Sequence, residues 1–309
     1  MPDDHDNAYA GLLVDDAHWA FGTGQEYARG EDPLAGVDAT IPEGVDGSVL
    51  AAYCLMLGDD ALVLSQRLSE WCSRAPDLEE DIALTNIALD LLGQARLLLA
   101  RAAAADPAVV PALPAGSPVP DEDRLAFFRE DRGFRNVRLV EAPNGDFAET
   151  IARIVLFSSW RLALFERLQD SRDAVLAAVA AKGVKELAYH RDFAARWFVI
   201  LARGTEESRT RLLGALEGLW PLWPELFESH EVERVAADSG VGVAPATVAA
   251  DVDAVLGQVL EAADIDRPEI VGLAGVRGRR GRDGSHTEAL SRMLAEMQSV
   301  ARAHPMGVW

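Results

Sequence analysis

Residues 77–96 have the sequence DLEEDIALTNIALDLLGQAR, in which apolar side chains recur at intervals of three and four positions. That spacing places the apolar side chains on one face of a long helix. Asp77 and Glu80 stand at the N-cap and N3 positions of a capping box, which predicts where the helix begins. The break at Pro76 separates this helix from an equally periodic segment upstream. The sequence therefore predicts an antiparallel helix pair, at about residues 48–74 and 78–105.

A second helix pair follows the same plan. Asn144-Gly145 is a turn signal, and Asp146 with Glu149 repeats the capping-box spacing. Two consecutive pairs of long helices predict a four-helix bundle. Ser285 and Glu288 have the capping-box spacing once more, ahead of the last helix. The second pair is predicted at about 147–169 and 173–201, a short helix within 125–141, and additional C-terminal helices at about 206–227, 245–263 and 286–303.

The predicted fold class is all-α, because no segment shows the sustained β-branched alternation of a sheet. Gly, Asp and Pro are frequent at the start of the sequence, which predicts an extended arm over residues 1–45. Residues 46–309 then form one helical domain. Of the 309 residues 49% are hydrophobic, which is enough to fill a sizeable core.

Composition and charge exclude several classes of function. The formal net charge is −21, which repels nucleic acid and anionic lipid over most of the molecule. The sequence contains no uninterrupted apolar run of about 18 residues, and its first residues are acidic, so we expect neither a membrane span nor a signal peptide. We therefore expect a cytoplasmic protein. Two cysteines, Cys54 and Cys72, lack the spacing of a metal site.

A four-helix bundle raises the question of a di-iron site. Such a site takes a Glu-x-x-His motif from each of two helices and a further carboxylate from each of the other two. No Glu-x-x-His motif occurs in the sequence. Two of the predicted helices have an apolar stripe that faces the interior. At the motif positions, the stripe of helix 78–105 has Leu91 and Gln94, and the stripe of helix 173–201 has Leu187 and His190. The predicted interior thus lacks the carboxylates that would hold iron.

The remaining polar residues of these helices allow two interpretations each. His190 is either a lone surviving ligand or a core histidine with a hydrogen-bond partner, and the second interpretation is favoured because one imidazole cannot hold two irons. Asn86, Asp90 and Gln94 form a row that we interpret as a hydrogen-bonded ridge rather than a ligand set. Asp59-Asp60 is interpreted as a local helix irregularity rather than an acid–base pair.

Several stretches together resemble the C-subunit family of the bacterial phenylacetyl-CoA 1,2-epoxidases. The resemblance runs in one register from about residue 48 to the end. The stretches that carry it are 57–60, 70–72, 75–84, 89–96, 143–147, 185–190, 204–206, Gly281, Gly284, 286–288, 294–298 and Trp309.

The resemblance implies a ferritin-like subunit that is structural rather than catalytic and holds no cofactor of its own. It implies a homologous catalytic subunit as partner, which binds the di-iron centre and phenylacetyl-CoA. A reductase with FAD and an iron–sulfur cluster supplies electrons from NADPH, and a bridging subunit is a further candidate partner. The positions matching the catalytic subunit's iron ligands are Gln66, Leu91, Gln94, Ser158, Leu187 and His190.

Two other classes of function stay open at this point. The chain could itself be a catalytic di-iron oxygenase subunit, which iron analysis would reveal, or a generic helical scaffold, which would associate with no di-iron homologue. A candidate docking loop lies between Gly275 and Gly284, where the chain is densest in basic residues. Its partner would be an acidic patch on another subunit or the phosphates of CoA, unless the arginines are merely solvated. The arginines are Arg277, Arg279, Arg280 and Arg282.

Overall fold

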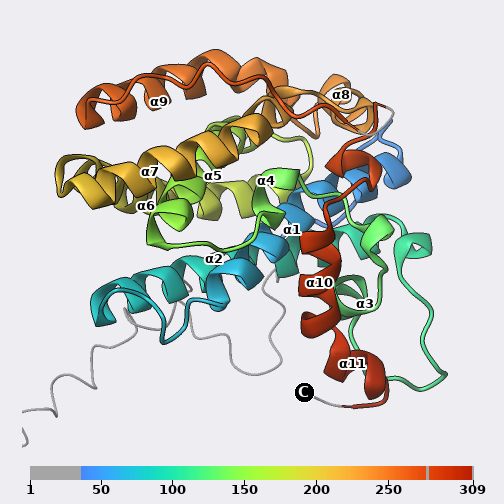
Figure 1. Ribbon diagram of the computed structural model, residues 1–309. Helices are drawn as coiled ribbons and strands as arrows, with labels where there is room; N and C mark the ends of the chain where they lie inside the picture. The colour runs from blue at the N-terminus through green and yellow to red at the C-terminus, as the bar shows by residue number, and fades with distance from the viewer. Residues whose placement is uncertain (1–35, 276–277, 308–309) are drawn as a thin grey trace, which may run out of the picture.

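The structure is a computed structural model, and it describes residues 36–275 and 278–307 (Figure 1). Four long helices form a ferritin-like bundle, and no β-strand occurs among these residues, which confirms the all-α prediction. The bundle helices are α1 (Gly47–Ser69), α2 (Leu78–Ala105), α5 (Phe147–Leu168) and α6 (Ala174–Arg203). Helices α1 and α2 form one pair and α5 and α6 the other, and α2 also lies against α6.

Side-chain caps fix where the long helices begin. Asp77 accepts a hydrogen bond from the backbone N–H of Glu80 at 3.4 Å, and Asp146 forms a reciprocal capping box with Glu149. Helix α1 ends at Ser69, five residues before the predicted end at residue 74. The chain turns there because Ser73 takes the left-handed conformation (φ 66°) and donates its N–H to Asp81 of α2 at 2.7 Å.

The C-terminal half covers the α5–α6 pair. Helices α7 (Glu206–Leu219) and α9 (Ala249–Ala263) pack on both α5 and α6, and Figure 1 shows them on the side away from α2. The α-helix predicted to reach residue 227 gives way at residue 220 to a 3₁₀ helix, η4 (Trp220–Phe227). Pro221 and Pro224 cause the change because they lack the N–H that an α-helix needs. A second 3₁₀ turn, η5 (Pro245–Val248), leads into α9.

One helix of this half was not predicted. It is α8 (Glu231–Asp238), which packs on α1. Its N-cap is His230, whose ring accepts from Val232 N–H at 3.2 Å while Glu233 accepts from His230 N–H at 2.7 Å. Histidine is not among the usual N-cap residues, so the local signal for a helix start is weak here.

Short elements and the C-terminal segment lie beside the α1–α2 pair (Figure 1). The region 125–141 holds two short helices rather than one, and the last helix starts later than predicted. Thr287, not Ser285, is its N-cap and makes no side-chain capping bond, so the third predicted capping box is wrong. The left-handed Gly284 (φ 72°) and the extended residues after it delay the helix. These elements are η2 (Pro107–Val109), α3 (Asp121–Phe127), η3 (Asp131–Gly133), α4 (Arg138–Glu141), η6 (Gly281–Asp283), α10 (Glu288–Met297) and α11 (Ser299–Ala303).

Two bundle helices are apolar enough to be compared with membrane spans. By length and composition alone α1 and α2 could each cross a bilayer. Core helices of a folded bundle meet the same criterion, and 78% of the apolar stretch of α1 is buried inside the structure.

The two cysteines, Cys54 and Cys72, are both free.

Candidate functional site

The bundle centre is built from the inward faces of α2, α5 and α6. Leu91 and Leu187, which the resemblance matches to two ligand glutamates, are 1% and 0% exposed and belong to one continuous hydrophobic core. Ser158 of α5 is equally buried and donates its hydroxyl to the carbonyl of Ile154, one turn earlier, at 2.6 Å. These three positions are therefore occupied by side chains whose packing or bonding is complete within the protein.

A polar chain crosses the centre beside them. Arg161 of α5, fully buried, donates its Nε–H to Gln94 Oε1 at 3.0 Å, and Gln94 Nε2 donates to Glu186 Oε2 at 2.9 Å. The cation on one side and the carboxylate on the other fix which way the Gln94 amide points. Glu186 also pairs with Lys182 at 3.7 Å, at the outer edge of the helix pair.

A second polar contact joins α2 and α6. His190 Nε2 lies 3.0 Å from Asp90 Oδ2, and the histidine is 1% exposed. Burial lowers the pKa of His190, and the Asp90 carboxylate partly opposes that shift. A neutral imidazole that donates Nε2–H to Asp90 fits this environment. The interpretation of His190 as a core histidine with a hydrogen-bond partner agrees with this contact. Of the predicted ridge of Asn86, Asp90 and Gln94, the last two form hydrogen bonds with residues of α6.

Burial dominates the electrostatics of the centre. It raises the pKa of Glu186 to about 7 and lowers the pKa of Arg161 to about 10. The guanidinium of Arg161 lies over the ring of Phe165, 4.4 Å from its centroid. Its two terminal nitrogens find no hydrogen-bond acceptor among the described residues. We name Asp90, Gln94, Arg161, Glu186 and His190 the central cluster.

The residues of the centre do not fit a di-iron group. Two iron ions need several anionic oxygen ligands, whereas the positions that the resemblance matches to iron ligands offer two leucines, a back-bonded serine, two amides and one histidine, and no carboxylate. A buried guanidinium adjoins the Gln94 amide, and its positive charge would oppose metal cations at close range. Gln66, the weakest of the predicted positions, lies half-buried on α1. A compact carboxylate group does occur elsewhere, at Asp77, Glu79 and Glu80, but on the surface, where Asp77 caps α2.

Arg161 was not predicted as a site residue, although a signal was present. It is the one basic residue between Ile154 and Phe165, a segment that is otherwise mostly apolar. A charged residue on the buried side of such a helix usually has an internal role, because long charged side chains are seldom fully buried without a partner.

The candidate docking loop separates into buried and exposed arginines. Arg282 is 5% exposed and pairs with Asp60 at 2.9 Å and with Glu233 at 3.3 Å. Burial works against its charge, yet these carboxylates raise the pKa of Arg282 above its usual value. Arg282 therefore anchors the loop inside the protein and is not part of an outer docking surface. Arg280 pairs with Glu228, Arg279 donates to the carbonyl of Asp283, and Arg277 lies outside the described residues.

Asp59 and Asp60 are helix residues with separate structural tasks. Helix α1 continues through both without a break, so the predicted helix irregularity is wrong. Asp59 binds Arg129 and accepts the N–H of Arg135 at 2.8 Å, and Asp60 accepts the N–H of Val137 at 2.8 Å. Both carboxylates are fully buried, and each ties a loop segment to α1.

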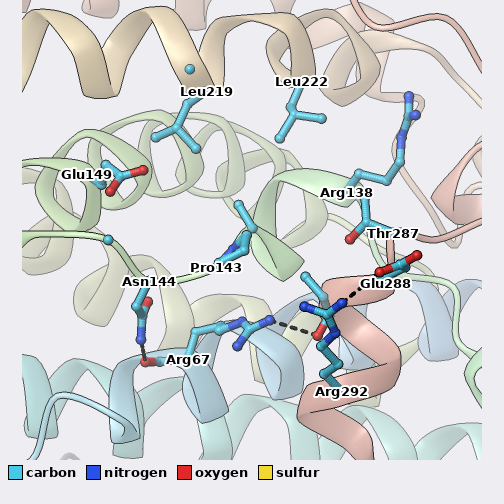
Figure 2. Close-up of a pocket in the computed structure, with 14 residues that line it drawn as sticks. Arg67, Arg138, Pro143, Asn144, Glu149, Leu219, Leu222, Thr287, Glu288 and Arg292 are labelled. Carbon is cyan, nitrogen blue, oxygen red and sulfur yellow. Dashed lines mark hydrogen bonds and ion pairs between the residues drawn. The ribbon is translucent and has the colours of Figure 1, made fainter.

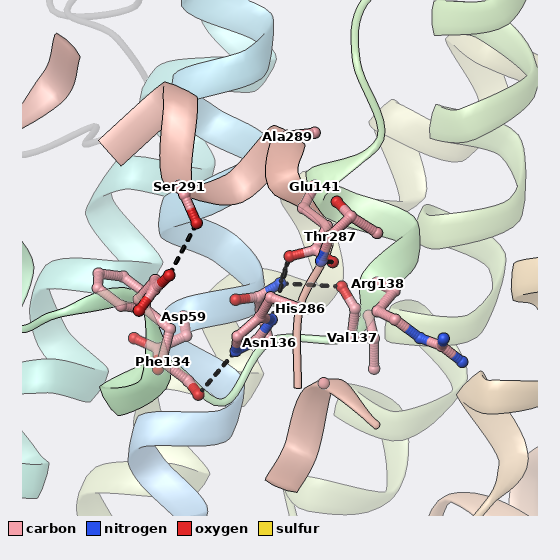
Figure 3. Close-up of polar contacts among 12 residues, drawn as sticks. Asp59, Phe134, Asn136, Val137, Arg138, Glu141, His286, Thr287, Ala289 and Ser291 are labelled. Atoms are coloured by element: carbon pink, nitrogen blue, oxygen red, sulfur yellow. Dashed lines mark hydrogen bonds and ion pairs between the residues drawn. The ribbon is translucent and has the colours of Figure 1, made fainter. Parts of the chain in front are cut away.

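His286 holds the start of the C-terminal segment against residues 134–141 (Figure 3). Its Nδ1 lies 3.1 Å from Glu141 Oε2, and its Nε2 lies 3.0 Å from the carbonyl oxygen of Phe134. Because both ring nitrogens face acceptors, the doubly protonated imidazolium satisfies both contacts. Burial opposes that charge, but Glu141 and the Phe134 carbonyl raise the pKa of His286. We name Asp60, Glu141, Glu233, Arg282 and His286 the C-terminal anchor.

A surface pocket of about 580 Å³ opens next to this anchor, between α1, α7, η4 and α10 (Figure 2). Leu219, Leu222 and Pro143 give it apolar walls. The charged side chains around it are engaged with protein groups: Arg67 donates to the carbonyls of Glu141 and Ala289, and Arg292 pairs with Glu288. The pocket therefore offers shape and apolar surface rather than a free set of charged ligands.

Fold and centre together define a ferritin-like helical protein whose interior is closed by leucines and a buried arginine. Comparison with known proteins agrees with this class. The model of the family described as "Phenylacetic acid catabolic protein" matches residues 39–309. The C-subunit of the 1,2-phenylacetyl-CoA epoxidase of Escherichia coli (strain K12) is 44% identical over 260 residues, which cover 84% of this chain and 99% of that protein. The chain belongs to the phenylacetic acid catabolic protein family.

Proposed function

We propose that the chain is a non-catalytic structural subunit of a cytoplasmic, multicomponent di-iron monooxygenase that epoxidises the ring of phenylacetyl-CoA. It pairs with the homologous catalytic subunit and stabilises it. In this proposal the di-iron centre resides in the partner, and FAD and an iron–sulfur cluster reside in the reductase. The likeness to a protein named as one subunit of an epoxidase supports membership of such a complex.

The observation that carries the proposal is the composition of the bundle centre. Leu91 and Leu187 are buried at the two motif positions, and Arg161 places a cation beside Gln94. Buried carboxylates without a cation would cost several kcal/mol, so leucines at these positions keep the bundle folded without metal. A chain that retained catalysis would need carboxylates at the same points.

The test is reconstitution with and without this chain. Iron content of the purified chain is measured by mass spectrometry, and epoxidation of phenylacetyl-CoA is followed with reductase and NADPH. We expect less than stoichiometric iron and no turnover by the chain alone, and stable complex formation with the catalytic subunit. Stoichiometric iron with an oxo-bridged absorption band, or turnover without the catalytic subunit, would contradict the proposal.

A further inference from the structure

The outer face of the α2–α6 pair is unusually apolar for a solvent-exposed helix surface. The exposed fractions are 45% for Ile82, 50% for Tyr189 and 53% for Ile200, and Leu78 at the start of α2 reaches 69%. Phe193 is half-buried beside them and stacks on Tyr189, with ring centroids 6.4 Å apart. Contiguous apolar surface of this kind marks interaction sites in folded proteins.

The contacts of the central cluster show that these side chains share one side. Asp90 faces His190 and Gln94 faces Glu186, so the two helices run antiparallel in a fixed register. At 3.6 residues per turn, Ile82 lies about 80° around α2 from Asp90, and Ile200 about 80° around α6 from His190, in the same sense. Equal rotation away from the facing residues of two antiparallel helices points both side chains to the same side.

In the part of the chain that the structure describes, the helices that cover α6 leave this side of it open. Helices α7 and α9 lie on the opposite side of α6 from α2 (Figure 1). We name Leu78, Ile82, Tyr189, Phe193 and Ile200 the outer apolar face.

Charge indicates what kind of surface this face would meet. Helices α2 and α6 together contain seven basic and six acidic residues, so their net charge is +1 within a chain of net charge −21. Three exposed basic side chains, Lys185, Arg196 and Arg203, lie on the side of α6 that carries the outer apolar face. Two copies of the chain, each with a net charge of −21, repel one another, which disfavours a second copy as the occupant of this face. A different subunit with an apolar surface and an acidic border fits better.

We propose that the outer apolar face of α2 and α6 is the surface on which this chain binds the catalytic helical subunit, through an apolar contact edged by carboxylates of that subunit. The inference rests on the proposed function for the existence of the partner and adds the place and chemistry of the contact. Apolar side chains at the middle of such an interface carry most of the binding energy, and border charges tune the association rate.

The test places charge on the face without disturbing the core. The double variant Tyr189→Glu/Ile200→Glu is compared with the matched control Val235→Glu/Val271→Glu, whose side chains are 42% and 89% exposed on other parts of the surface. Circular dichroism and thermal melts establish that both fold. Binding to the purified catalytic subunit is measured by sedimentation velocity, with wild type alongside. We expect affinity to fall about 100-fold for the face variant and to stay within threefold of wild type for the control.

Each result has one interpretation. Unchanged affinity of a folded face variant, or an equal loss in the control, overturns the inference while wild-type binding keeps the proposed function intact. The proposed function itself fails if wild type does not bind the catalytic subunit. Self-association of wild type that the face variant abolishes would assign the face to a second copy and overturn the inference. A salt series adds a further readout: we expect wild-type association to slow as salt rises, and Lys185→Ser/Arg203→Ser to flatten that dependence.

Discussion

The central cluster and the C-terminal anchor are both buried and polar, yet they are completed differently. In the anchor every charge has an opposite partner: Arg282 contacts two carboxylates, and both nitrogens of His286 meet acceptors. In the central cluster the terminal nitrogens of Arg161 have no acceptor among the described residues, and Glu186 reaches Arg161 only through Gln94. The charges of the C-terminal anchor are thus fully paired within the protein. In the bundle centre, by contrast, leucines surround Arg161, whose charge is only partly compensated.

The largest expected effect comes from introducing the Glu-x-x-His pattern of di-iron bundles into the centre. Leu91→Glu and Leu187→Glu together with Gln94→His should lower the free energy of unfolding by about 5 kcal/mol, because two carboxylates become buried without matching cations. Urea unfolding measures the loss, and iron analysis of the variant should still give less than stoichiometric metal, because the supporting contacts around each ligand are missing. The volume-conserving variant Leu91→Met/Leu187→Met should cost less than about 1.5 kcal/mol per site. A triple variant as stable as wild type would show that the centre tolerates charge as the anchor does.

Breaking the anchor should cost somewhat less. Arg282→Leu leaves Asp60 and Glu233 buried without their cation, and we expect a loss of about 3–4 kcal/mol in urea unfolding. The matched control is Arg292→Leu, whose side chain is 79% exposed and pairs with Glu288 one turn away. That change should stay within about 0.5 kcal/mol. Equal effects of the two substitutions would refute the distinction between an internal anchor and surface charge.

The ionisation of Glu186 should make the stability of the central cluster depend on pH, which distinguishes it further from the C-terminal anchor. Its pKa of about 7 exceeds the ordinary value, so the folded chain binds this proton more tightly than the unfolded chain does. Stability therefore falls as pH rises from about 4.5 to 7, and ionised Glu186 costs on the order of 3 kcal/mol above that range. Glu186→Gln should stabilise the chain by this amount at pH 8 and change little at pH 5, as measured by denaturant unfolding. Glu217→Gln, at an exposed position on α7, should show no such difference.

The smallest expected effects are on the pH dependence of stability, which should have opposite directions for His286 and His190. The pKa of His286 is raised, so its contribution is present below about pH 6.5, the unfolded value, and is lost as pH rises through the folded pKa. His286→Gln should therefore cost on the order of 1 kcal/mol at pH 6 and less at pH 9. The pKa of His190 is lowered, so stability falls as pH drops below the unfolded value, and His190→Gln should remove that acid-side loss. Parallel stability profiles of the two variants would contradict the assigned protonation states.

Local pattern determined much of this fold from sequence. The three-and-four periodicity around Leu91 and the caps at Asp77 and Asp146 placed the bundle helices to within a few residues, because these signals depend only on neighbours along the chain. The absence of Glu-x-x-His likewise needed only the sequence. It singled out Leu91 and Leu187, which the structure places in the buried centre.

Other features depended on residues far apart in the chain, and only the tertiary structure decided them. Arg282 looked like an exposed basic residue until the fold brought Asp60 to it, 222 positions away. Glu186 stands four residues after Lys182, a spacing typical of a solvated helix face, but α2 covers it and supplies Gln94 as its partner. Burial and pairing arise when helices pack together, so no local pattern reports them. The sequence by itself determined which helices form, and the packing decided which charges lie inside them.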